Sequence, residues 1–83
     1  MSVKLDVLAE FEQVARQQKK KLAPLTDDLV LLDSGLDSLC LAIIVARLED
    51  ALGVDPFSAA DAEFPVTLRD FVRLYEDAVP ATP

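Results

Sequence analysis

Ser38 stands at the end of a short polar turn and at the start of a strongly apolar stretch. The turn reads Leu-Asp-Ser-Gly-Leu-Asp-Ser-Leu over residues 32–39, and Gly35 gives it backbone freedom. Asp37 occupies the position of a helix N-cap, so Ser38 falls at the first helical position with its hydroxyl directed outward. Unpaired N–H groups and the positive end of the helix dipole favour phosphate at such a place. The pattern therefore indicates a serine that can accept a phosphate-linked group.

The residues around Ser38 do not make it a catalytic nucleophile. The chain has no histidine, which is the usual general base for a reactive serine. The nucleophile-elbow pattern also fails, because Leu36 and Cys40 stand where it requires glycine. Cys40 is the only cysteine, so an intrachain disulfide and a Cys/His metal site are both excluded. We expect it to be a small buried hydrophobe at the margin of the core face of the following helix, and not a reactive thiol. We interpret Ser38 as a substrate for modification, in a protein that is not an enzyme and holds no metal.

The segment Gly35-Leu36-Asp37-Ser38-Leu39 resembles the phosphopantetheine attachment motif of acyl carrier proteins, and the resemblance covers nearly the whole chain. It implies a small all-α four-helix bundle with a long first loop. It also implies that Ser38 receives 4′-phosphopantetheine from coenzyme A, attached by an external transferase that uses Mg²⁺. In that reading, Asp37 caps the helix and takes part in recognition by the transferase.

Helical spacing of apolar residues predicts three main helices and one short helix. The first spans about Val3 to Lys20, and the second runs from Ser38 to about Leu52, where Gly53 is placed to end it. Ser58–Asp61 has the pattern of a short capped helix. The last helix is expected to follow Thr67. Each of the three main helices has a predicted apolar face. These faces consist of Val7, Leu8, Phe11, Val14 and Ala15 in the first helix, Leu41, Ile44, Val45, Leu48 and Leu52 in the second, and Leu68, Phe71, Val72 and Tyr75 in the last.

Residues 22–37 form a long connection that is too rich in leucine for a solvated loop. Several of these leucines are therefore expected to pack on the helices, and Phe57 and Phe64 are expected to anchor the core beyond the second helix. The leucines concerned are Leu25, Leu29, Leu31, Leu32 and Leu36.

The charge of the chain limits its partners. A net charge of −7 argues against nucleic acid and anionic membranes, and favours basic protein surfaces. Apolar runs stay well short of the roughly 20 residues of a membrane span, and charged residues near the N-terminus do not fit a signal peptide, so we expect a cytoplasmic protein. The length leaves room for one domain, over residues 1–83, and we expect a monomer.

A run of basic residues stands at the end of the first predicted helix. It is either a solvated helix end or a contact for an acidic partner. It consists of Arg16, Lys19, Lys20 and Lys21.

Opposite its core face, the second helix carries a second apolar strip, next to Ser38, that folding does not require. The strip consists of Leu39, Ala42, Ile43 and Ala46. The strip is either further packing within the chain or a docking surface for partner enzymes. In the second reading, the contacts would be made by Leu36, Leu39, Ala42, Ile43, Ala46, Glu49 and Asp50.

The resemblance also bears on the cargo. Carrier proteins of fatty-acid synthesis usually have acidic residues where this chain has Cys40 and Ile43. The helix is similar to those of peptidyl carrier domains, although Asp37 replaces their usual histidine. The combination favours an amino acid or small acyl cargo, loaded by a separate activating ligase and passed to downstream acyl-transfer enzymes. A carrier of fatty-acid synthesis and a cofactor-free helical adaptor are the alternatives.

Overall fold

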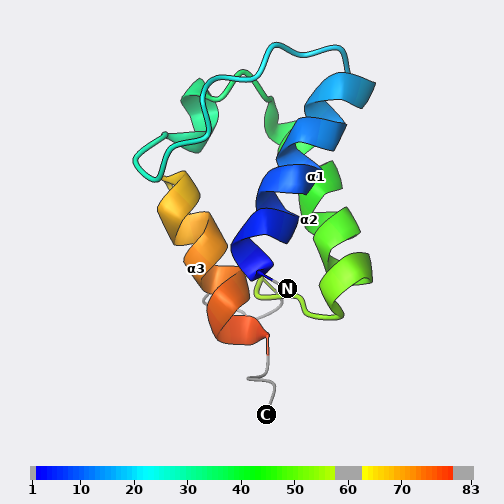
Figure 1. Cartoon of the computed structure of the whole chain (residues 1–83), viewed down its shortest axis with the longest axis vertical. Coiled ribbons are helices and arrows are strands. Elements are labelled where there is room, and N and C mark those ends of the chain that lie inside the picture. Colours follow the sequence, from blue (N-terminus) through cyan, green and yellow to red (C-terminus); the bar gives the residue numbers. More distant parts are fainter. Residues whose placement is uncertain (1, 58–62, 80–83) are drawn as a thin grey trace.

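The computed structural model describes residues 2–57 and 63–79. It contains the helices α1 (Val3–Gln17), α2 (Ser38–Leu52) and α3 (Leu68–Ala78), with a 3-10 turn, η1, at Leu31–Asp33. Helix α1 packs against both α2 and α3, and the long loop closes one end of the bundle (Figure 1). The described ranges hold no strand, so the all-helical prediction is confirmed. The predicted short helix at Ser58–Asp61 lies outside the described residues.

The core lies between the three helices and is built on aromatic rings. Phe11 of α1 meets Phe71 of α3 edge-on, with ring centroids 5.3 Å apart, and Tyr75 packs beside Phe71. Each such fully buried side chain contributes about 1.5–3 kcal/mol to folding. The predicted apolar faces are buried along their centres, whereas Leu8, Val45 and Leu52 are half-buried at their edges. In the described residues, the helices contribute Val7, Phe11, Val14, Ala15, Cys40, Leu41, Ile44, Leu48, Leu68, Phe71, Val72 and Tyr75 to the buried core.

Helix α1 ends at Gln17, three residues before the predicted end at Lys20. Lys19 adopts a left-handed conformation with φ 56°, which breaks the helix. The N–H of Lys19 donates to the carbonyl of Arg16 and that of Lys20 to the carbonyl of Ala15, at 3.2 and 2.8 Å. These two bonds form a Schellman motif, usually closed by glycine, and a lysine gives no such signal in the sequence.

The first loop is tied to the chain just before α3. The N–H of Leu31 donates to Val66, and that of Leu68 donates to Leu29, around an isolated bridge between Val30 and Thr67. Of the loop leucines, Leu31 and Leu36 are buried and Leu25 and Leu29 are half-buried, as the prediction required.

No helix in the described part of the chain is long and apolar enough to cross a membrane.

Two large apolar residues stay outside the core: Leu32, one of the loop leucines, and Phe64, which was expected to anchor the core. Leu32 is 79% exposed because it neighbours buried Leu31 in the 3-10 turn η1, where successive side chains diverge by a third of a turn. Phe64 is 50% exposed, and its ring stacks on that of half-buried Phe57 at a centroid distance of 5.4 Å. Both residues therefore contribute apolar surface next to α2 instead of core.

Candidate functional site

Helix α2 begins at Ser38 and is capped by Asp37, as predicted. Oδ1 of Asp37 accepts a hydrogen bond from the N–H of Cys40 at 2.9 Å, and its carbonyl accepts from Leu41. The bond from Cys40, assisted by the nearby ammonium of Lys20, lowers the pKa of Asp37 below its ordinary value. Ser38 is exposed. Its position leaves the hydroxyl accessible beside helix N–H groups that have no partner within the helix.

The motif contains a second serine, Ser34, whose environment is the opposite. Ser34 is fully buried, and its hydroxyl donates to the carbonyl of Leu31 and accepts from the N–H of Leu36. Both bonds shape the turn, so the Ser34 hydroxyl is committed to structure. The sequence reasoning missed this role, although a serine two residues before its backbone partner is typical of such turns. Of the two motif serines, only Ser38 is available to a modifying enzyme.

Gly35 brings the first loop against the motif. It has φ 95°, and a Cβ at this position would lie 2.1 Å from the carbonyl oxygen of Lys21. The N–H of Ala23 donates to the carbonyl of Ser34 at 2.9 Å and secures the same contact. Only glycine allows the two backbones to approach this closely. The motif glycine therefore sets where the basic run lies relative to α2.

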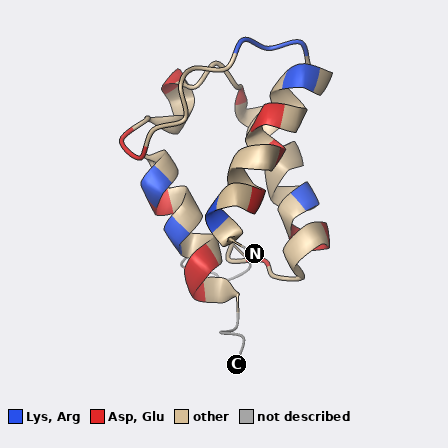
Figure 2. Cartoon of the chain, in the orientation of Figure 1, with Lys and Arg blue, Asp and Glu red and all other residues tan. Residues whose placement is uncertain are grey.

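The approach at Gly35 places one lysine of the basic run on the helix cap. Nζ of Lys20 lies 3.6 Å from Oδ2 of Asp37, and both side chains are partly exposed. Figure 2 shows a cluster of positive charges at the end of α1 and in the loop that follows, besides separate ones on all three helices. Neither interpretation of this run from the sequence includes an ion pair within the chain, because Lys20 and Asp37 stand 17 positions apart.

An apolar hollow of about 230 Å³ lies directly beside Ser38. A second hollow of about 250 Å³ adjoins it and shares the side chains of Leu32 and Phe64. The exposed side chains that the two hollows share, Leu32 and Phe64, are the ones that did not enter the core. A long flexible substituent on Ser38 fits this site, because its root faces solvent and its length has apolar surface to lie on. The first hollow is lined by Leu32, Ser38, Leu41, Ala42 and Phe64.

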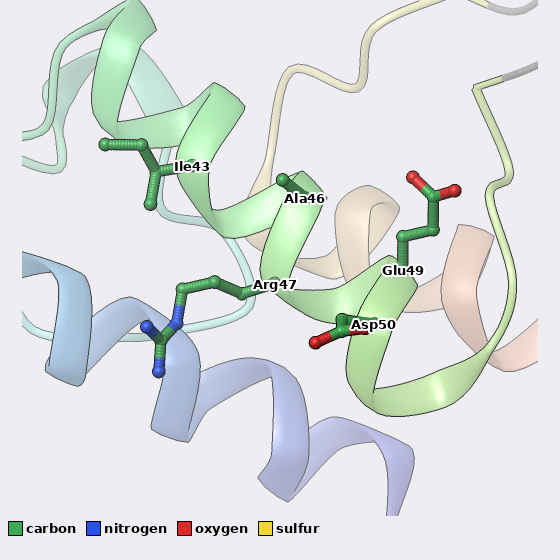
Figure 3. Close-up of a pocket in the computed structure, with 5 residues that line it drawn as sticks. All are labelled: Ile43, Ala46, Arg47, Glu49 and Asp50. Atoms are coloured by element: carbon green, nitrogen blue, oxygen red, sulfur yellow. The ribbon is translucent and has the colours of Figure 1, made fainter.

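Most of the predicted docking residues lie on the side of α2 that faces away from the core, called here the outer face. They are Leu39, Ala42, Ile43, Ala46, Glu49 and Asp50. Figure 3 shows Ala46 and Glu49 on this face, whereas Arg47 turns toward α1, where it pairs with Glu10. A shallow hollow of about 490 Å³ lies among these side chains. Ile43 is half-buried. The exposed members of the predicted set are Leu39, Ala42, Ala46, Glu49 and Asp50.

Two expectations about this face need correction. Leu36, expected to touch partners, is 3% exposed and packs in the core, because the turn that Ser34 closes directs it inward. Cys40 is 1% exposed, as expected of a small buried hydrophobe, so its comparison with the exposed acidic positions of fatty-acid carriers is wrong. It lies one turn before Ile44 on the buried side of α2, and burial raises the pKa of its thiol. Of the two positions used to argue about cargo, only Ile43 reaches the surface.

Residues 6–74 match the family described as the phosphopantetheine attachment site. The match runs from the first turn of α1 into α3 and includes the whole of the capped turn around Ser38. No curated protein and no solved structure matches the chain.

Proposed function

The chain belongs to the phosphopantetheine attachment site family, and on that premise we propose that Ser38 is the residue to which the arm is attached. Members of this family bind 4′-phosphopantetheine covalently and act as carriers, so the protein is a carrier protein of the acyl carrier type and not an enzyme. The observation that supports Ser38 is the contrast within the motif: Ser38 is exposed at the start of α2, while Ser34 is buried and doubly hydrogen-bonded.

The attachment step needs little from this chain beyond presenting a hydroxyl. A phosphopantetheinyl transferase removes the proton from Oγ of Ser38, and Oγ forms a bond to the phosphorus of coenzyme A that bears pantetheine. The bond from that phosphorus to the adenosine bisphosphate breaks, and the bisphosphate leaves. The N-terminus of α2 stabilises the added negative charge. Once bound, the group supplies a terminal thiol that holds cargo as a thioester.

We propose the outer face of α2 as the docking surface for partner enzymes. It combines exposed apolar side chains near Ser38 with carboxylates at the far end of the helix, at Glu49 and Asp50. Basic partners would be steered by the net charge of −7 and released readily, as a shuttle requires. The proposed surface consists of Leu39, Ala42, Ile43, Ala46, Glu49 and Asp50.

For the cargo we propose an amino acid or a small specialised acyl group, loaded by an activating ligase in the cytoplasm. Ile43 supports this preference, and Cys40 no longer does. The apolar hollow beside Ser38, at about 230 Å³, has room for a small apolar group. The whole chain acts as one carrier domain and as a monomer in this proposal. Charging of the holo protein by fatty-acid enzymes alone would contradict the preference.

The attachment proposal is tested by weighing the intact apo protein after incubation with coenzyme A and a broad-specificity transferase. We expect the wild type to gain one phosphopantetheine group and Ser38→Ala to gain none. Ser2→Ala is the matched control, because Ser2 is also an exposed serine at a helix start. It should gain mass like the wild type. A wild type that stays unmodified, or a Ser38→Ala variant that is modified, would contradict the proposal.

A further inference from the structure

We propose that Lys20 is the counter-ion of the phosphate on Ser38, and that it sets the direction in which the arm leaves the protein. This inference rests on the proposed function, because it requires the phosphate to be attached at Ser38. It assigns to one lysine of the basic run a role as a positioning residue.

The backbone on both sides of Lys20 is held in place. Its own N–H donates to the carbonyl of Ala15 at 2.8 Å and closes the end of α1. The carbonyl of the next residue, Lys21, lies against Gly35, where no side chain would fit. The position of the Lys20 side chain next to α2 therefore follows from the packing of the loop, and not from a chance rotamer on the surface.

The side chain reaches the residue next to the attachment point. Nζ of Lys20 lies 3.6 Å from Oδ2 of Asp37, and Asp37 immediately precedes Ser38. The other carboxylate oxygen, Oδ1, is occupied by the N–H of Cys40, so the cap does not depend on the lysine. Lys20 is partly exposed, and rotation within its four-carbon stem can bring the ammonium between the carboxylate and a phosphate on Ser38.

Charge gives Lys20 a reason to be there. Attachment places a second anion beside Asp37 in a chain whose net charge is already −7. Neighbouring like charges repel, and one ammonium between them offsets the repulsion. Three other cations of the described chain are paired away from this site: Arg47 with Glu10, and Lys4 and Arg69 with Asp27. Lys20 is the cation that the structure pairs with the neighbour of Ser38. With the phosphate held toward Lys20, the root of the arm points to the first loop and away from the acidic end of α2.

The test compares the rate at which an amine-reactive anhydride labels each lysine in the apo and holo proteins. An amine held between two anions is less accessible to the reagent and therefore reacts more slowly. We expect Lys20 to be labelled about threefold more slowly in the holo protein, once the thiol of the arm is blocked. Lys19 and Lys21 are internal controls in the same run, and their rates should change little. The ³¹P resonance of the holo protein should also move in Lys20→Met and stay in place in Lys19→Met.

Two results would overturn the inference about Lys20. One is equal labelling of Lys20 in apo and holo protein, and the other is an equal slowing of all three lysines, which would indicate a general field. Failure of the proposed function is seen earlier and separately, because the holo sample is weighed before labelling. If no mass is gained, no holo protein exists and the attachment at Ser38 itself is wrong.

Discussion

The carbonyl oxygen of Lys21 occupies the space next to Gly35 where any other residue would place its side chain, since a Cβ there would lie 2.1 Å away. The contact joins the start of the first loop to the turn before α2. It explains why the motif needs glycine at this position both for its φ of 95° and for the close approach.

Gly35→Ala should therefore lower the free energy of unfolding by about 3 kcal/mol, because it adds a steric clash with backbone to a strained φ. Gly53→Ala is the matched control: its φ of 72° is also left-handed, but nothing lies within 4 Å of the added Cβ. It should cost about 1 kcal/mol. Urea denaturation measures both, and equal losses would show that the contact with Lys21 contributes nothing.

Lys19→Gly should stabilise the protein by about 1 kcal/mol. Lys19 is the only residue other than glycine with a positive φ in the described ranges, and glycine takes this conformation without strain. Lys21→Gly, two residues on, is the control and should give no gain, because it only adds freedom to the unfolded chain. Thermal and urea denaturation of the two variants decide the matter; a loss of stability in Lys19→Gly would argue against the Schellman ending of α1.

Substitution of Asp37 should show a dependence on pH. Its pKa is lower in the folded protein than the ordinary 3.8, chiefly through the N–H of Cys40 and also through Lys20. Its contribution is therefore complete above the unfolded pKa and disappears as the pH falls through the folded pKa. At pH 7, Asp37→Ala should lower the midpoint of thermal unfolding by about 5 °C, and Asp37→Asn by less, since asparagine still caps. Circular dichroism should show the difference from wild type shrinking as the pH falls below 3.8; a constant difference would contradict the assigned cause.

Tyr75→Phe should raise the free energy of unfolding by about 1 kcal/mol. The Tyr75 hydroxyl is buried and finds no hydrogen-bond partner within residues 2–57 and 63–79. Its burial therefore costs desolvation free energy that no hydrogen bond offsets, and removing the hydroxyl removes that cost. Burial raises the pKa of Tyr75, so the wild type should also lose stability above pH 10, where the unfolded chain ionises and the folded one resists. Urea denaturation at pH 7 and pH 11 measures both effects. A less stable Tyr75→Phe would reveal a partner for the hydroxyl.

The helices and most of their buried faces could be predicted, because they depend on local spacing and on caps such as Asp37, Thr67 and Gly53. The end of α1 could not, since a lysine in a left-handed conformation leaves no mark in the sequence. Positions at the margin of a helix face are similarly ambiguous. Cys40 lies at such a margin: its expected role as a small buried hydrophobe is confirmed, but its comparison with the exposed acidic positions of fatty-acid carriers is wrong.

The site at Ser38 was predictable as a capped helix start, but its surroundings were not. The contact between Lys20 and Asp37 and the buried bonds of Ser34 depend on how the first loop folds back, which spacing in the sequence does not encode. The apolar hollow beside Ser38 likewise forms because Leu32 and Phe64 stay outside the core.

Fragmentation mass spectrometry of the protein treated with coenzyme A and transferase locates the attached group on the chain. Attachment at Ser38 predicts a single phosphopantetheine group, found on Ser38 in every modified molecule. A group found on Ser2 or Ser34, or a protein that remains bare while a known carrier in the same tube is modified, would contradict it.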